Sequence, residues 1–526
     1  MLWAGTVLCA ALAAAGLVVR DRRTRYMLLA AALVLAPILV IGDNWDSGRV
    51  ADLRDRPAFA AVGLAAALAA LYLGALVIRA RPALLVPLLV AALPFRIPVD
   101  LGGGSSNLLL PLYAVIAVGV IAALMGTQAA GAGATSGASD GPGSSPSSRG
   151  PLLRYISLAL AVVLVLYALQ SGLAEEISPA VQNVGFFLVP FAALFALLAE
   201  QPLDGATLRR VLWVLAIEGV LLALVAGYQY AARDLFWNDK VIAGNEAHPY
   251  FRVNSLFFDP NIFGRYLAIS MVALATVVAY GRRRAELIGA SVVFAILLAA
   301  LVVTYSQSST IALIAGMLVL IAARWGIAQG VGAGIAAVLL VAAAIALISG
   351  GGLTDEDSSG RKGLIEGGVE MAKDEPLLGV GSGAFADEFK KRYGAAEGFA
   401  AVSHTEPITV LAEQGVVGFA AYLAFLAVTI GGLVAALGPR LAKPARGPAL
   451  AAALTGIYAV LLVHSLGYAA FFTDPVTWAV LAFAAGTLVP LGERAPRSGG
   501  EETTAAEGSG GDGPADGGAS EPQPVT

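Results

Sequence analysis

Charged residues, cysteine and histidine are all scarce in this sequence. Of its 526 residues only 13% are charged, about half of the roughly 25% that soluble globular domains carry. The single cysteine, Cys9, excludes an internal disulfide and any metal site built from several cysteines. Three histidines argue against a histidine-rich metal centre, so we expect no bound metal. The net charge of −4 offers no basic surplus to nucleic acid, which excludes that partner.

Apolar residues fill most of the chain instead. Hydrophobic residues make up 58% of it, and the mean hydropathy is +0.78. Apolar runs of about 20 residues between charge clusters are typical of membrane-spanning helices. The sequence therefore predicts an all-α polytopic membrane helix bundle with about 15 (12–15) spans. We expect these at 2–19, 26–42, 58–78, 82–94, 107–125, 152–171, 181–199, 209–229, 262–280, 285–304, 309–323, 330–349, 407–434, 448–469 and 476–491, with 82–94 short enough for a half-span.

Lysine and arginine in the connections predict the orientation of the bundle. More than half of the basic residues lie in alternate, mostly short connections, such as those at 20–25 and 282–284. This pattern marks the cytoplasmic side. The long connections 230–261 and 350–406 then lie on the exoplasmic side. The first span lacks a basic leading region and a cleavage site, so we expect it to be retained, with the N-terminus outside and the C-terminus inside.

Two low-complexity segments divide the chain. Gly, Ala, Ser and Pro dominate residues 126–150, which predicts a flexible cytoplasmic linker. Residues 492–526 are acidic and Gly-rich, which predicts a disordered cytoplasmic tail. The expected organisation is 1–125 N-terminal membrane spans, 126–150 linker, 151–349 membrane core, 350–406 large exoplasmic loop, 407–491 C-terminal membrane spans and 492–526 tail.

Polar residues gather first at the start of the span near residue 262. Asp259 is a good N-cap and Pro260 suits the first helical position. Arg265 follows Asn261 by four residues, so both lie on one helix face, and Arg252 precedes the cap. A snorkelling Arg265 and a solvated Arg252 would explain these residues without function.

Two further segments offer backbone amides to an anion. The short hairpin at 304–310 contains Ser306, Ser308 and Ser309, which can cap the next helix and leave its amides pointing outward. Capping alone is also a sufficient explanation. The glycine-rich stretch 379–383 could cradle phosphate, although such a stretch is a weak pattern by itself.

After the cluster near residue 262 and the 304–310 hairpin, the third polar cluster lies at the end of the 350–406 connection. Thr405 can cap the following helix, in which Glu406 and Pro407 occupy the first turn, so His404 lies just before a helix N-terminus. The positive end of the helix dipole favours an anion and disfavours an imidazolium, which suits a neutral histidine that acts as a base. An inert, exposed histidine is the simpler alternative.

The three clusters together indicate one outward-facing site. Arg252, Arg265 and Arg361 would add cationic donors to three helix N-termini. Guanidinium groups match phosphate oxygens two at a time, so the site suits a diphosphate.

At this point the sequence resembles the O-antigen ligase and polymerase-like family of bacterial membrane enzymes, over roughly residues 150–470. Each matching stretch is short, but their order is fairly specific. The matching stretches are Arg252 through Asn261, Ser306–Ser309, Arg361, the Asp-Glu-Pro-Leu-Leu-Gly-Val-Gly run at 374–381 with Phe385, and 404–418 with His404, Glu413, Gly415 and Gly418.

The resemblance implies a metal-independent GT-C-type glycosyltransferase with its site on the outer face of the membrane. The donor would be a glycan on a polyprenyl diphosphate, the acceptor a sugar hydroxyl of a glycan or glycolipid, and no cofactor would be needed. His404 would be the base, and Arg252 and Arg361 would hold the diphosphate. Supporting positions are Asn261, Ser308 and Glu406.

Two positions depart from the family pattern. Ser309 follows Ser308 where the family often has arginine, and Thr405 follows His404 where asparagine is common. Arg265 or Lys391 could supply the missing cation.

A transporter or flippase for an anionic or lipid-linked substrate is the alternative. Such proteins place ionisable residues near the middle of the membrane. Here most spans carry none, and Glu218 and His464 are among the few exceptions. A structural membrane partner of an assembly complex would need no cationic pocket around His404. The polar residues at the outer surface favour the enzyme, and the choice between ligase and polymerase stays open.

Overall fold

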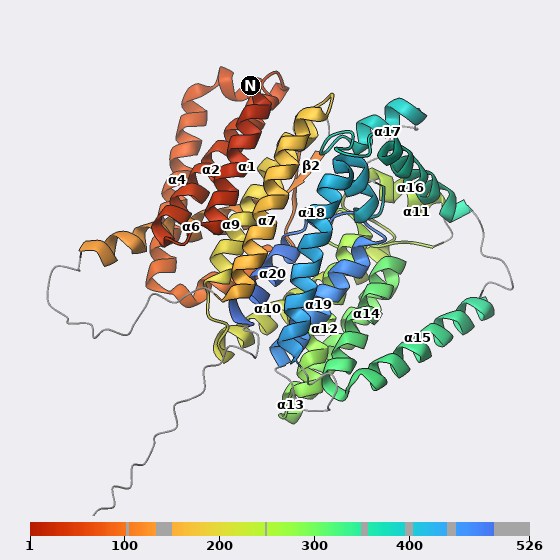
Figure 1. The fold of residues 1–526 in the computed structure, drawn as a ribbon. Coiled ribbons are helices and arrows are strands. Elements are labelled where there is room, and N and C mark those ends of the chain that lie inside the picture. The colour runs from red at the N-terminus through yellow and green to blue at the C-terminus, as the bar shows by residue number, and fades with distance from the viewer. Residues whose placement is uncertain are drawn as a thin grey trace, which may run out of the picture. The chain divides into compact units, whose positions relative to one another are not determined.

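In its described part, the protein is an assembly of helices with one short strand pair (Figure 1). The computed structural model describes residues 1–100, 105–132, 150–247, 250–348, 356–394, 403–438 and 449–488. The elements are α1 (Leu2–Val18), α2 (Arg22–Asp43), α3 (Gly48–Asp55), α4 (Pro57–Ala80), η1 (Pro82–Leu84), α5 (Leu85–Ala92), β1 (Ile97–Asp100), β2 (Ser105–Leu108), α6 (Leu110–Ala132), α7 (Pro151–Gln170), η2 (Ser171–Leu173), α8 (Ser178–Asn183), η3 (Val184–Leu188), α9 (Val189–Ala199), α10 (Gly205–Ala232), α11 (Asp239–Ala247), α12 (Pro260–Tyr280), α13 (Arg284–Val303), α14 (Gln307–Trp325), α15 (Ile327–Ile348), α16 (Glu356–Asp374), α17 (Phe385–Tyr393), α18 (Glu406–Leu437), α19 (Ala449–Ser465) and α20 (Pro475–Thr487).

Many of these helices are apolar enough to lie in a membrane. Within the described ranges, nine are also long enough to cross one, and six further apolar helices of 10–17 residues accompany them. Each span expected from the sequence coincides with one of these helices. The multi-pass membrane character is therefore confirmed. The count of about fifteen crossings stays a prediction.

Small residues bring α12, α14 and α19 close together. A Cβ added to Gly316 of α14 would stand 2.9 Å from the carbonyl oxygen of Gly456 in α19. Likewise, a Cβ at Gly264 of α12 would stand 2.6 Å from Oγ of Ser309. Such close approach at small residues is how membrane helices associate through van der Waals packing. Gly264 and Ser309 bring the first turns of α12 and α14 together, and Oγ of Ser308 lies 3.4 Å from Nε2 of His464 in the last turn of α19.

Helix caps agree with the sequence at most of these ends. Asn261 donates its backbone N–H to Oδ1 of Asp259 at 2.6 Å, and Ser309 donates to Oγ of Ser306 at 3.3 Å. Thr405 occupies the N-cap position of α18, but its hydroxyl makes no capping hydrogen bond. The expected threonine cap is therefore wrong in its chemistry, although its position is right.

Several connections are more ordered than the sequence indicated. The 350–406 connection contains α16 and α17, and the 230–261 connection contains α11. The segment 82–94 is short, as expected, and leads into the antiparallel β1–β2 hairpin, in which Ile97 pairs with Leu108. Helix α6 continues to Ala132, so the start of the expected linker is helical. The rest of that linker and the tail lie outside the described residues.

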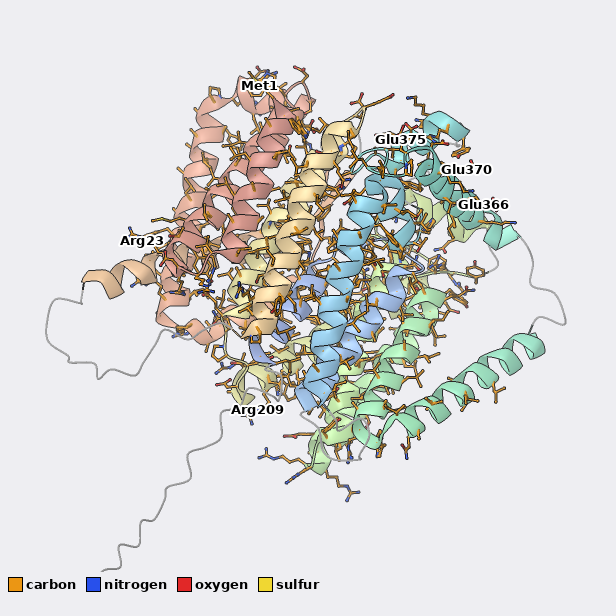
Figure 2. All side chains as sticks on the ribbon, viewed as in Figure 1. Met1, Arg23, Arg209, Glu366, Glu370 and Glu375 are labelled. Atoms are coloured by element: carbon orange, nitrogen blue, oxygen red, sulfur yellow. The ribbon has the colours of Figure 1, made fainter. Side chains whose placement is uncertain are left out.

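Contacts made by the last residues of α7 show which segments lie at the same end of the helices. Trp3 donates its indole N–H to the carbonyl of Leu169 at 3.2 Å, and Gln170 donates to the carbonyl of Leu378 at 3.1 Å. The N-terminus and the 350–406 connection therefore lie at the same end, as the predicted orientation requires. Figure 2 shows the same relation, with Met1 and Glu375 at one end and Arg209 at the other.

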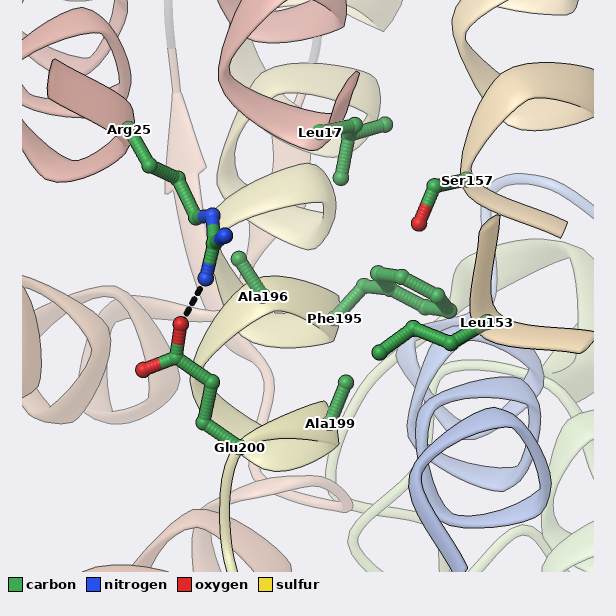
Figure 3. A pocket seen from close by; sticks show the side chains of 8 residues that line it. All are labelled: Leu17, Arg25, Leu153, Ser157, Phe195, Ala196, Ala199 and Glu200. Carbon is green, nitrogen blue, oxygen red and sulfur yellow. Dashed lines mark hydrogen bonds and ion pairs between the residues drawn. The ribbon is translucent and has the colours of Figure 1, made fainter. Parts of the chain in front are cut away.

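A small pocket lies at the other end of α7. Figure 3 shows Ser157 of α7 and the ion pair between Arg25 and Glu200 around it. Arg25 also donates from Nε to the carbonyl of Val19 at 3.3 Å and from Nη2 to that of Arg20 at 3.2 Å. The guanidinium thus satisfies carbonyls at the end of α1 and ties α2 to α9, which is a structural role.

Candidate functional site

Arg252 and the 304–310 hairpin lie together, as two of the three predicted clusters required. Arg252 donates from Nε to the carbonyl of Thr304 at 3.0 Å and from Nη2 to Oδ1 of Asn261 at 3.3 Å. Ser306 donates to the same Asn261 oxygen at 2.8 Å. Asn245 fixes the backbone of Arg252 with two hydrogen bonds of 2.9 Å each. Asn261 is therefore an acceptor that the arginine and a serine of the hairpin share.

The same network continues to a buried histidine. Ser308 lies 3.3 Å from Ser306 between their Oγ atoms, and 3.4 Å from Nε2 of His464. His464 occupies the last turn of α19 and is fully buried. Its ring centroid lies 5.8 Å from that of Tyr468. The sequence singled out His464 as polar within a span but gave it no role, because its neighbours come from distant segments.

Tyr468 links this network to His404. Their ring centroids lie 6.5 Å apart. Burial and the Asp259 carboxylate, its hydrogen-bond partner, raise the pKa of the Tyr468 hydroxyl. Through this hydrogen bond Tyr468 ties the loop after α19 to the N-cap of α12. Contacts thus run from Arg252 through Asn261, the serines and His464 to Tyr468 and His404.

His404 adopts a left-handed backbone conformation, with φ 62°. Non-glycine residues seldom occupy this region, and such strain is concentrated at functional sites. Its neighbours hold the turn: Thr405 donates its backbone N–H to Oγ of Ser403 at 3.2 Å, and Ser403 lies 2.9 Å from the hydroxyl of Thr409. The imidazole is half-buried. Its position before α18 agrees with the sequence analysis.

Arg265 is almost wholly buried and forms an ion pair with Asp474. Its Nη1 also donates to the carbonyl of Ala470 at 3.4 Å. Asp474 in turn caps α20, since it accepts the backbone N–H of Val476 at 2.8 Å. The arginine thus fastens the 466–474 loop, which carries Tyr468, to the first turns of α12.

Two more charged residues, Arg96 and Glu406, lie near this ion pair. Arg96 belongs to the connection after α5. Burial lowers the pKa of its guanidinium, and the Asp474 carboxylate opposes that shift. Arg96 and Asp474 line one small pocket with Tyr266. Glu406 accepts the backbone N–H of Phe471 at 3.1 Å. The predicted supporting role of Glu406 is therefore consistent with a contact that holds α18 against the same loop.

The glycine-rich stretch 379–383 binds a carboxylate of the chain. Gly383 and Phe385 donate their backbone N–H groups to the Glu413 carboxylate at 2.9 and 3.2 Å. Gly381 donates to the Glu413 carbonyl at 2.9 Å. These amides are already paired, so the idea of a phosphate cradle is wrong. The turn holds α18 instead.

The segment just before this turn packs against a kink in α18. Gly415 has φ 58°, and a Cβ there would stand 2.5 Å from the carbonyl carbon of Leu377. Val416 donates its N–H to the Pro376 carbonyl at 2.8 Å. The matching runs at 374–381 and 404–418 thus form one structural unit, which fixes the helix that follows His404.

The remaining residues expected at the site are either outside the described side chains or paired with carboxylates. Arg361 lies in α16, but its side chain is outside the described part of the chain, as is His248. Lys391 forms an ion pair with Glu175, and Arg265 with Asp474. Both candidates for the missing family arginine therefore have carboxylate partners.

Sequence reasoning missed Tyr468, Asp474 and the contact of Arg96 with this region. Asp474 was detectable, because Asp474-Pro475 repeats the cap pattern of Asp259-Pro260. Tyr468 gave no local signal. Across the described ranges, no three His, Cys, Asp or Glu side chains gather as metal ligands would.

Comparison with known proteins supports the resemblance noted from the sequence. Residues 292–423 match a family model described as O-antigen ligase. This segment includes Ser308, Arg361 and His404 but neither Arg252 nor Tyr468. No curated protein matches the chain. The match confirms an O-antigen ligase-like segment and indicates membrane glycan transfer of that kind.

Proposed function

We propose that the protein is a glycosyltransferase that moves or polymerises a glycan from a polyprenyl diphosphate onto a sugar hydroxyl at the outer face of the cytoplasmic membrane. The contact chain from Arg252 to His404 supports this most directly, because it links an arginine and a histidine at one end of the helices. The orientation of that end outward follows from the basic residues in the opposite connections.

Arg252 would bind the diphosphate of the donor. Its contacts with described residues use Nε and Nη2, and its half-buried side chain keeps Nη1 for a phosphate oxygen. A guanidinium held by two protein acceptors is already oriented, so less side-chain entropy is lost on binding. Arg361 would add a second donor from α16. Arg265, which is paired with Asp474, would support the site by holding the loop that carries Tyr468.

His404 would act as the general base. It would take the proton from the acceptor hydroxyl as that oxygen bonds to the anomeric carbon of the donor sugar. The bond between that carbon and the diphosphate oxygen would break, and the arginines would stabilise the charge on the leaving diphosphate. A positioned base contributes roughly 100- to 10,000-fold, and each donor aimed at developing charge about 3–4 kcal/mol.

A deletion strain would test this function. Lipid-linked glycans would be extracted and their lengths compared with those of the wild type. Loss of long chains would identify a polymerase, and build-up of complete lipid-linked chains would identify a ligase. Unchanged lengths on both the lipid carrier and the final acceptor would contradict glycan transfer. Accumulation of the donor on the cytoplasmic side would favour the flippase.

A further inference from the structure

Two tyrosine rings stack beside Arg252. The ring centroids of Tyr250 and Tyr305 lie 4.9 Å apart, with an angle of 27° between the planes. Tyr250 precedes Arg252 by two residues, and Tyr305 directly follows Thr304, whose carbonyl accepts the Nε–H of Arg252 at 3.0 Å. The guanidinium and the stacked pair therefore share one short stretch of the surface.

The backbone of Tyr305 is strained. Its φ of 51° lies in the left-handed region, where a bulky side chain is an outlier and glycine would be favoured. Tyr305 as a whole residue is also 45% exposed, so burial in the protein core does not explain the conformation. The hairpin nevertheless holds it, because Tyr305 donates its N–H to Val302 at 3.1 Å.

Exposed tyrosines also occur at membrane–water interfaces, where they anchor helices. Anchoring needs no left-handed residue, since a tyrosine in ordinary helical or extended conformation presents its ring equally well. Tyr228 and Phe236 illustrate this alternative. Their rings stack at 6.2 Å and both are exposed, yet neither has a positive φ.

We propose that Tyr250 and Tyr305 form a platform for the donor sugar that is joined to the diphosphate. The inference rests on the proposed function, in which Arg252 holds that diphosphate. The first sugar is bonded directly to the diphosphate, so it must lie next to Arg252. The aliphatic face of a pyranose packs well on an aromatic ring, because the aromatic face is apolar and carries the negative side of its quadrupole. The platform therefore selects a glycosylated carrier over a bare one.

Binding to the purified full-length protein in detergent tests the platform. The probes are a bare polyprenyl diphosphate and the same lipid carrying one hexose or one N-acetylhexosamine. The wild type should bind a sugar-bearing probe about three- to tenfold more tightly than the bare one. Tyr305→Gly should lose this difference and bind the bare probe as before. Its thermal midpoint should stay the same or rise, because glycine relieves the left-handed strain.

Two further variants separate the alternatives. Tyr305→Leu keeps an apolar side chain but should lose the preference for the sugar. Tyr228→Leu, the matched change in the other exposed pair, should keep it. Equal binding of all probes by the wild type would overturn the platform. So would a Tyr305→Gly protein that keeps the preference, or one that loses stability and affinity for every probe alike. Arg252→Ala should weaken the binding of all probes equally. If it leaves their binding unchanged, that result would count against the proposed diphosphate site and not against the platform.

Discussion

The ring of Tyr468 lies 6.5 Å from that of His404, although 63 positions separate them in the sequence. The Tyr468 hydroxyl bonds with Asp259, the N-cap of α12. The turn before α18, the loop after α19 and the first turn of α12 therefore meet at one tyrosine. This meeting places the proposed base close to the helix end where Arg252 and Asn261 interact.

Replacement of His404 should abolish glycan transfer. His404→Asn is the sharpest variant, because asparagine tolerates the left-handed conformation at this position but has no basic nitrogen. We expect transfer to fall by at least about 100-fold, with normal membrane insertion and thermal midpoint. An in vitro assay with lipid-linked donor measures this. Transfer within a few fold of the wild type would contradict the role of His404 as the base.

Substitution of Arg252 should weaken use of the donor without unfolding the protein. Arg252→Ala removes the guanidinium, and Arg252→Lys keeps the charge but loses the fork that bonds Thr304 and Asn261. Both should raise the KM for the lipid-linked donor, and Arg361→Ala should do so as well. Full activity of Arg252→Lys would show that a point charge suffices and would contradict the need for a guanidinium oriented by Thr304 and Asn261.

The ion pair between Arg265 and Asp474 should matter mainly for stability. Both side chains are almost completely buried, at 2% and 6% exposure. Removal of one partner from such a pair leaves an uncompensated charge and costs about 3–5 kcal/mol. Arg265→Met and Asp474→Asn should each lower the thermal midpoint in detergent well below that of Arg252→Ala. A midpoint equal to that of the wild type would instead favour a direct role in binding the substrate.

Gly415→Ala should disrupt the outer part of α18. The left-handed backbone disfavours alanine by roughly 1–2 kcal/mol, and the new Cβ would meet the Leu377 backbone at 2.5 Å. Gly431→Ala in the same helix is the matched control, because a Cβ there has open space and alanine favours helix. Limited proteolysis should cut Gly415→Ala faster than the wild type and Gly431→Ala no faster. Equal rates in both variants would contradict the kink.

Local patterns predicted the long apolar helices and many of their ends. Apolar runs marked every span region, and the Asp259-Pro260 pair marked the start of α12 as the structure has it. Such signals lie within a few residues of one another, so one sequence reveals them. The same reasoning failed for the 379–383 glycines, because the carboxylate that takes their amides comes from Glu413.

The sequence by itself determined a membrane protein of apolar helices, with its distinctive polar residues beside particular helix starts, because hydropathy and capping are local properties. Only the tertiary structure decided which of those residues meet. Arg265 is joined to Asp474, Arg252 to the serine hairpin, and His464 to both Ser308 and Tyr468. These contacts depend on how closely α12, α14 and α19 approach through Gly264, Gly316 and Gly456. Packing between distant segments sets that approach, and no single stretch of sequence contains it.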